Sequence, residues 1–469
     1  MNTRPYRFVA VVVALALALG GCAVTDTVGH WFSGGGKKSK LKGTRISIMA
    51  TDESVRPDPT LGKINVLLPP PYRNADWPEP GGYADNAMYH LSAPGPLKQV
   101  WEQDAGEGSN SASRLTASPV VAAGKIFVLD AKARVFAFDA NSGEPAWHVS
   151  VAPQGHTDLS YTLSFGMFGE DKSIDATKGF GGGIAFNDGK LYATTGFGDV
   201  VALDAASGKE LWRVNVGVPI FNAPVVDGGR VFVSAQDNHF HAFAASTGRE
   251  LWDHQGIIES AGILESTSAA VAGEFLIAPY TSGEIFALRV QNGRPAWSDM
   301  LTRSGNVTAM SEIDDIAGRP VIDRDMVFAI SHSGVMVAIN LNTGDRQWSR
   351  DLGGIQTPWV AGDYVYVLTT DAQLLCLTRK EGRVKWIHQL PRWVDPTDTT
   401  SDPIVWSGPV LASDRLLLVS SGGHAESISP YTGELLGRIE IPSGAYIAPI
   451  VANDTVYILT NDATLIALR

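Results

Sequence analysis

The sequence predicts an all-β fold, an eight-bladed β-propeller of four-stranded antiparallel blades. The first observation is a motif that recurs along the chain and is clearest at Ala202–Trp212. It consists of an apolar strand end, a polar turn with a glycine, and a tryptophan four residues after that glycine. Recurrence at a period of roughly 40–50 residues indicates an array of identical supersecondary units.

The second observation is that the same series of short apolar segments accompanies each copy of the motif. In the first unit, strands are expected near residues 119–122, 126–130, 134–139 and 146–150. The segments are almost continuously apolar, which is typical of strands buried on both faces. Four-stranded units that repeat radially form a β-propeller.

The third observation concerns the two ends of the array. The last unit begins at Pro449 and contains only three strands, whereas residues 97–104 form a lone strand before the first unit. An open array would expose two long strand edges, which promote aggregation. We therefore expect the lone strand to complete the last blade and close the ring.

Each tryptophan is expected to dock its blade against the neighbouring blade, because an indole buries a large area and carries one N–H donor. The seventh unit is degenerate, since its tryptophan slot holds Gly437. The expected docking residues are Trp101, Trp147, Trp212, Trp252, Trp297, Trp348 and Trp386.

The N-terminus predicts export. Arg4 and Arg7 precede an apolar run over residues 8–19 that ends at Cys22, which is typical of a secretory signal. We expect a signal peptide at 1–21, a tether and irregular extension at 22–96, and the propeller at 97–469.

The only other cysteine, Cys376, lies in an apolar strand and is expected to be a small buried hydrophobe. The net charge of −12 argues against nucleic acid as a partner.

The Leu-Gly-Gly-Cys ending at residues 19–22 resembles the bacterial lipoprotein box. This resemblance implies that Cys22 is lipidated, with palmitate among its acyl chains, and becomes the mature N-terminus. No aspartate follows the cysteine directly, which by the sorting rule implies the outer membrane, facing the periplasm. An ordinary signal peptide with a chance cysteine is the alternative.

The repeat itself resembles that of the pyrroloquinoline-quinone-type propellers. Enzymes of that superfamily hold the quinone between a tryptophan and a disulfide of adjacent cysteines, with a calcium ion and an acidic base. This chain has no pair of adjacent cysteines, and its repeat acids lie mostly in turns, where aspartate suits the turn geometry. We therefore expect no catalytic residue, no cofactor and no metal, with a quinoprotein dehydrogenase as an alternative.

The lipoprotein box, tether and repeats together resemble the BamB family of outer-membrane assembly lipoproteins. Residues 41–48 and 74–82 look like the longer N-terminal region of alphaproteobacterial members. The resemblance implies a scaffold that binds the POTRA domains of BamA, other lipoproteins of the assembly complex, and unfolded outer-membrane proteins. A free-standing periplasmic propeller that binds peptides or polysaccharides is a further alternative.

By the same resemblance, the partner contacts fall in two interblade loops, residues 255–267 and 303–319. The first loop lacks the arginine of the family, and the acidic pair of the second differs in spacing. The isoleucines can alternatively pack under their own loop. The expected contact residues are Ile257, Ile258, Ile263, Leu264, Glu265, Asp314, Asp315 and Arg319.

Two further features have open interpretations. His239 and His241 share one strand face, but no third ligand is apparent nearby, so a metal site is not expected. The irregular aromatic insertion at about residues 153–182 either caps the propeller or meets a partner.

Overall fold

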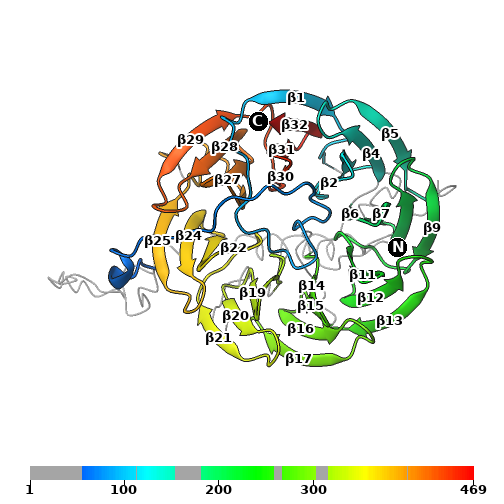
Figure 1. Cartoon of the computed structure of the whole chain (residues 1–469), viewed down its shortest axis with the longest axis horizontal. Coiled ribbons are helices and arrows are strands. Elements are labelled where there is room, and N and C mark those ends of the chain that lie inside the picture. The colour runs from blue at the N-terminus through cyan, green and yellow to red at the C-terminus, as the bar shows by residue number, and fades with distance from the viewer. Residues whose placement is uncertain (1–54, 112, 154–180, 258–266, 303–314, 399) are drawn as a thin grey trace, which may run out of the picture. The chain divides into compact units, whose positions relative to one another are not determined.

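The computed structural model describes residues 55–111, 113–153, 181–257, 267–302, 315–398 and 400–469. Within these residues, eight four-stranded sheets are arranged in a ring around a central axis (Figure 1). All ladders within the sheets are antiparallel. The predicted eight-bladed propeller is confirmed.

In blades 1 to 7 the strands run in chain order from the axis outward. Blade 1 contains β2 (Val120–Ala122), β3 (Lys125–Leu129), β4 (Arg134–Asp139) and β5 (Pro145–Ser150). Blade 2 contains β6 (Gly182–Asn187), β7 (Lys190–Thr195), β8 (Asp199–Asp204) and β9 (Glu210–Asn215). Blade 3 contains β10 (Val225–Asp227), β11 (Arg230–Ser234), β12 (His239–Ala244) and β13 (Glu250–Gln255). Blade 4 contains β14 (Ala270–Ala272), β15 (Phe275–Pro279), β16 (Glu284–Arg289) and β17 (Pro295–Met300).

The remaining blades follow the same order, apart from the last strand of blade 8. Blade 5 contains β18 (Val321–Asp323), β19 (Met326–Ile330), β20 (Met336–Asn340) and β21 (Arg346–Arg350). Blade 6 contains β22 (Trp359–Ala361), β23 (Tyr364–Leu368), β24 (Gln373–Thr378) and β25 (Val384–Gln389). Blade 7 contains β26 (Trp406–Ala412), β27 (Arg415–Ser420), β28 (His424–Ile428) and β29 (Leu435–Glu440). Blade 8 contains β30 (Ile450–Ala452), β31 (Thr455–Leu459), β32 (Thr464–Leu468) and β1 (Gln99–Asp104).

Strand β1 closes the ring, as predicted. It pairs with β32 from Gln99↔Leu468 to Asp104↔Thr464. Just before it, the amide of Lys98 donates to the carbonyl of Arg469 at 2.7 Å, and the amide of Arg469 donates back at 2.9 Å. The outer side of β32 is therefore covered by the first strand of the propeller.

The seven motif tryptophans lie at seams between neighbouring blades. At seven seams, the indole Nε1 of one blade donates to a backbone carbonyl in the next blade, over distances from 2.7 to 3.2 Å. The pairs are Trp101 with Asn141, Trp147 with Ala205, Trp212 with Ala245, Trp252 with Val290, Trp297 with Leu341, Trp348 with Arg379, and Trp386 with Pro430.

The turn glycine of each motif has a steric role at these seams. Gly208, for example, has φ of +73°, and a Cβ added there would lie 2.7 Å from the ring of Trp147. Glycine therefore supplies both the left-handed backbone and the space that the indole of the preceding blade fills. In β29, the outer strand of blade 7, the tryptophan slot holds Gly437, and a Cβ added there would meet nothing within 4 Å.

The alternation of strand directions gives the ring two faces. The loop face carries the connections between blades and the turns between second and third strands. The turn face carries the turns between first and second strands and between third and fourth strands. The described ends of the two interblade loops, at residues 255–257, 267 and 315–319, therefore belong to the loop face.

Residues 55–98, the described part of the chain before β1, lie on the turn face. They contain the short 3-10 helix η1 (Pro59–Leu61) and otherwise have no helix or strand before β1. We call residues 74–91 the inner segment, which runs around the axis inside the ring (Figure 1). Trp77 is only 2% exposed and stacks on Trp359 with ring centroids 6.3 Å apart, whereas Tyr83 is 41% exposed.

The inner segment hydrogen-bonds to the innermost strand of every blade, or to the turn that follows it, in the order of the ring. In chain order, it pairs Asn74 with Val451 and Asn453 of blade 8, Trp77 with Val121 of blade 1, Pro78 with Phe186 of blade 2, Glu79 with Val226 of blade 3, Ala84 with Val271 of blade 4, Asp85 with Ile322 of blade 5, Tyr89 with Trp359 of blade 6, and Leu91 with Leu411 of blade 7. The sequence did not predict this path.

Candidate functional site

The first candidate site is the pair of interblade loops on the loop face. At Ile257, the backbone is fixed on both sides, because its amide donates to Oε2 of Glu284 at 2.8 Å and its carbonyl accepts from Nδ2 of Asn238. The side chain of Ile257 is 52% exposed. A rigid backbone with an exposed apolar side chain suits a contact with another protein.

The second loop ends close to the axis. Asp315 is only 2% exposed, and its carbonyl accepts from the amide of His332 at 2.9 Å. A buried side chain cannot be touched by a docking partner, so the structure differs here from the expected contact set. Arg319 is half-buried and lines a cavity on the axis.

The ends of the two loops meet beside the axis. Oγ1 of Thr267 donates to the carbonyl of Ala317 at 2.7 Å, which ties the end of the first loop to the end of the second. Six of the expected site residues lie outside the described residues: Cys22, Ile258, Ile263, Leu264, Glu265 and Asp314. The same holds for most of the insertion at 153–182.

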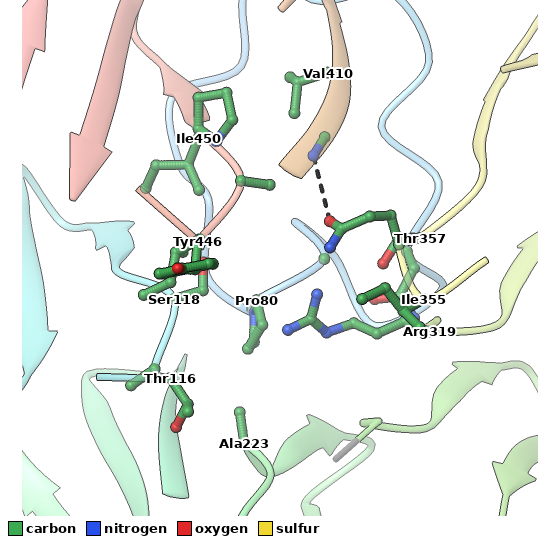
Figure 2. Close-up of a pocket in the computed structure, with 18 of the residues that line it drawn as sticks. Pro80, Thr116, Ser118, Ala223, Arg319, Ile355, Thr357, Val410, Tyr446 and Ile450 are labelled. Carbon is green, nitrogen blue, oxygen red and sulfur yellow. Dashed lines mark hydrogen bonds between the residues drawn. The ribbon is translucent and has the colours of Figure 1, made fainter. Parts of the chain in front are cut away.

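The axial cavity is the second candidate site (Figure 2). Its volume is about 130 Å³, and Trp77, Pro80 and Gly81 of the inner segment form part of its lining. Much of the rest comes from short stretches that precede the innermost strands, such as Thr116–Ser118 and Asn222–Ala223. Because these stretches lie toward the loop face and the inner segment toward the turn face, the inner segment forms the floor of the cavity.

The chemistry of this cavity is mixed. The side chain of Arg319 points into it, and Oε1 of Gln356 accepts from the amide of Gly408 at 3.3 Å (Figure 2). Among the described residues that line it, Arg319 is the only charged one, and none is a histidine, cysteine, aspartate or glutamate. The lining therefore offers hydrogen bonds and a cation, but no acid–base pair or nucleophile of the usual kinds.

Sequence reasoning did not identify this cavity. A signal for it exists, since a small residue precedes a proline just before the innermost strand in several units, as at Ser118, Ala223 and Ala448. Small side chains at these positions leave space on the axis.

The two histidines singled out from the sequence have carboxylate partners. Nε2 of His239 lies 2.9 Å from Asp253, and Nδ1 of His241 lies 2.8 Å from Glu250. In the described part of the chain, no group of three or more potential ligands is arranged to hold a metal ion.

Cys376 is buried in blade 6, and burial raises the pKa of its thiol, so it is not a reactive cysteine. No helix among the described residues is long and apolar enough to span a membrane.

Comparison with known proteins gives a consistent family. The profile of the family described as "Outer membrane protein assembly factor BamB" matches residues 91–171 and 170–388, together more than half of the chain. The chain is 27% identical over 363 residues to that assembly factor from Shewanella oneidensis, covering 76% of this chain and 85% of the relative. It is 25% identical over 377 residues to that of Burkholderia pseudomallei, covering 80% and 88%.

Solved structures show the same fold. The crystal structure of BamB from Moraxella catarrhalis matches with a TM-score of 0.65 and 16% identity, covering 80% of this chain and 99% of that one. A quinohemoprotein alcohol dehydrogenase from Comamonas testosteroni matches with a TM-score of 0.62 and 15% identity, covering 85% and 81%. At such identities, both likenesses concern the fold alone.

Proposed function

The chain belongs to the family of outer membrane protein assembly factor BamB, and we propose that it is a non-enzymatic scaffold that binds the POTRA domains of BamA. The family match over residues 91–388 is the observation that carries this proposal. The match begins at Leu91, the last residue of the inner segment, and runs through blades 1 to 6. Both interblade loops lie within it.

We place the BamA contact on the loop face. Ile257 is exposed there on a fixed backbone, and the ends of the two loops are joined by the bond from Thr267 to Ala317. The inner segment occupies the opposite face, so it does not cover this surface. Asp315 is left out of the proposed contact because it is buried.

The proposal is tested by recovery of BamA. The tagged full-length protein is pulled down from detergent-solubilised cell envelopes, and BamA is detected with a specific antibody. Reproducible recovery is expected. Absence of BamA under conditions that recover the tagged chain would reject the scaffold and favour a free-standing peptide- or polysaccharide-binding propeller.

Single substitutions locate the contact. Ile257→Asp introduces a charge at an exposed apolar position of the loop face and should reduce BamA recovery about tenfold, whereas stability should change little. Asp314→Arg in the second loop should act in the same direction. The matched control is Leu211→Asp on β9 at the outer rim, which is similarly exposed. Equal recovery with Ile257→Asp and with the unmodified chain would place the contact elsewhere.

We further propose that lipid on Cys22 attaches the protein to the outer membrane. Cys22→Ala should move the chain from the outer-membrane fraction to the soluble periplasmic fraction, and its propeller should unfold at the same temperature as before. Radiolabelled palmitate should mark the unmodified chain only. Labelling of the variant, or its continued membrane association, would contradict the anchor.

The residues on the axis do not fit the alternative of a quinoprotein dehydrogenase. A calcium ion requires oxygen ligands, usually carboxylates, and the described residues that line the axial cavity include none. Cys376 is buried in blade 6 and has no adjacent cysteine. We therefore expect no quinone-dependent dye reduction by the protein after incubation with quinone and calcium.

A further inference from the structure

A hollow on the turn face is strongly acidic. Its volume is about 620 Å³, and it is bordered by the inner segment and by the innermost strands of blades 1 to 4. We call it the acidic hollow and define it by five residues: Asp76, Glu79, Asp85, Asp188 and Asp227. Among the described residues that line it, none is a lysine, arginine or histidine.

Glu79 shows that this site lacks a donor. Its side chain is 3% exposed, and Oε1 accepts from the amide of Val226 at 2.9 Å, but Oε2 has no hydrogen-bond partner. The pKa of Glu79 is raised to about 8, mainly by burial and to a smaller extent by the nearby charges of Asp227 and Asp85. A buried carboxyl oxygen without a partner is costly, and an entering cationic donor would remove that cost.

Among the described residues, no cation pairs with the other acids of the hollow either. Asp76 accepts from the amide of Ala123 at 3.2 Å, and Asp85 accepts from the amide of Ala87 at 3.1 Å. Burial raises the pKa of Asp85. In the described part of the chain, none of the five acids of the hollow forms a salt bridge.

The position of Glu79 is set by the backbone rather than by flexible side chains. Its amide donates to the carbonyl of Gly82 at 3.0 Å, and the amide of Gly82 donates back at 2.8 Å, which closes a tight turn. The preceding residue, Pro78, accepts from the amide of Phe186 in blade 2. The backbone at Glu79 is thus held in place before any ligand arrives, which lowers the entropic cost of binding at this residue.

We propose that the acidic hollow is a docking site for a basic segment of a partner protein, whose lysine or arginine side chains pair with these carboxylates. Charge complementarity identifies this occupant: the site presents five acids and no base, and it includes a buried oxygen that needs a donor. It is not arranged as a chelating metal site among the described residues. The inference does not depend on the proposed function, because the hollow lies on the face opposite the interblade loops.

The test measures binding of a fluorescein-labelled peptide of eight lysines to the full-length chain by fluorescence anisotropy at low ionic strength. A peptide of eight glutamates is the reference ligand. The double variant Asp188→Asn with Asp227→Asn removes two charges from the rim of the hollow and should weaken binding of the lysine peptide about tenfold. Raising the salt concentration should also weaken it, because exposed ion pairs are screened.

The matched control is Asp345→Asn with Glu434→Gln. These two exposed residues lie in turns of the same face, outside the hollow, and removing them changes the net charge by the same amount. Binding should then change less than about twofold. Equal weakening by both pairs, or no weakening by the first, would overturn the proposal, as would equal binding of the glutamate peptide.

Glu79→Gln provides a second measurement at the buried oxygen. Above pH 8, where the carboxyl of Glu79 is ionised, this variant removes the charge with little change in shape and should weaken binding of the lysine peptide several-fold in the unmodified background. Circular dichroism and the unfolding midpoint confirm that the fold is retained. Unchanged affinity in a folded Glu79→Gln protein would contradict the role given to this residue.

Discussion

At seven seams, the indole of the preceding blade fills the space that a side chain at the turn glycine would need. The glycine and the tryptophan of the motif are therefore required together, because each glycine makes room for the tryptophan of the preceding blade. Gly208 meets Trp147 in this way, whereas Gly189 of the same blade has the same φ of +73° but nothing within 4 Å of an added Cβ. The two positions separate backbone strain from contact with the ring.

Gly208→Ala should destabilise the protein more than Gly189→Ala. Both substitutions place alanine at positive φ, which costs about 1–2 kcal/mol. At Gly208 the added methyl also overlaps the indole, which adds roughly 1–3 kcal/mol of overpacking. Urea unfolding followed by tryptophan fluorescence measures the difference. Equal losses would mean that backbone strain alone explains the glycine.

Glu79 should make stability depend on pH. Its pKa in the folded protein, about 8, lies above the ordinary value of 4.5 because of burial. The folded state therefore binds the proton more tightly, so its stability falls as the pH rises from about 4.5 to about 8. Glu79→Gln should remove this fall, which amounts to roughly a few kcal/mol.

The measurement is the unfolding midpoint of both proteins at pH 5 and pH 8. Burial lowers the pKa of His254, which acts in the opposite direction, and this effect is common to both proteins. The difference between the two proteins isolates Glu79. A fall of equal size in the variant would refute the assignment.

At the scale of elements, the inner segment was only partly predictable. Its irregular, extended character follows from its prolines and glycines, and the buried side chain of Trp77 fixes it to the propeller. Its circular path was not predictable, because most of its contacts join peptide groups, which every residue carries. No side-chain pattern records which carbonyl faces which amide.

The interblade loops show the same limit. The family resemblance placed the acidic pair in the second loop, yet Asp315 is buried and Arg319 faces the axial cavity. Whether a loop side chain points outward or inward depends on backbone turns that sequence spacing does not specify. The strands differ in this respect. Because β15, β19 and β23 are buried on both faces, their sequences are continuously apolar and can be recognised.

Asn86→Gly should test how strongly the inner segment joins neighbouring blades. Nδ2 of Asn86 donates to the carbonyls of Ala269 in front of β14 and Pro320 in front of β18, at 3.3 and 2.8 Å. Its φ is +59°, which glycine tolerates, so the variant loses the side-chain bonds without added strain. We expect a loss of about 1–3 kcal/mol in urea unfolding.

The control for this variant is Tyr83→Ala in the same segment, where the side chain is 41% exposed. It should cost less than about 0.5 kcal/mol. If both variants unfold at the midpoint of the unmodified protein, the bonds of Asn86 do not contribute to stability.

For the whole molecule, seven seams are closed by tryptophans and one is closed differently. Between blades 7 and 8, the chain leaves the inner segment and passes to β1, and Nη2 of Arg415 donates to the carbonyls of Ala93 and Gly95. Gly437 leaves the tryptophan slot open at this seam. The exception in the repeat pattern thus coincides with the place where the N-terminal part of the chain enters the ring.

Truncations should show what closes the ring. Removal of residues 1–54 should leave the unfolding midpoint unchanged, because β1 and the inner segment remain. Removal of residues 1–92 should destabilise the ring, and removal of residues 1–104 should also expose the edge of β32 and cause aggregation. Light scattering and thermal unfolding measure these effects. A soluble, cooperative protein without residues 1–104 would show that β1 is dispensable.

The inner segment has a consequence for the order of events during synthesis. Its residue Asn74 is bound by Val451 and Asn453, which lie almost at the other end of the chain. The inner segment leaves the ribosome early, but its contacts with blade 8 can form only after nearly the whole chain has been translocated. Because such distant contacts are slow to form, the newly exported protein should remain open and vulnerable until blade 8 arrives, and then acquire resistance to proteases in a single late step.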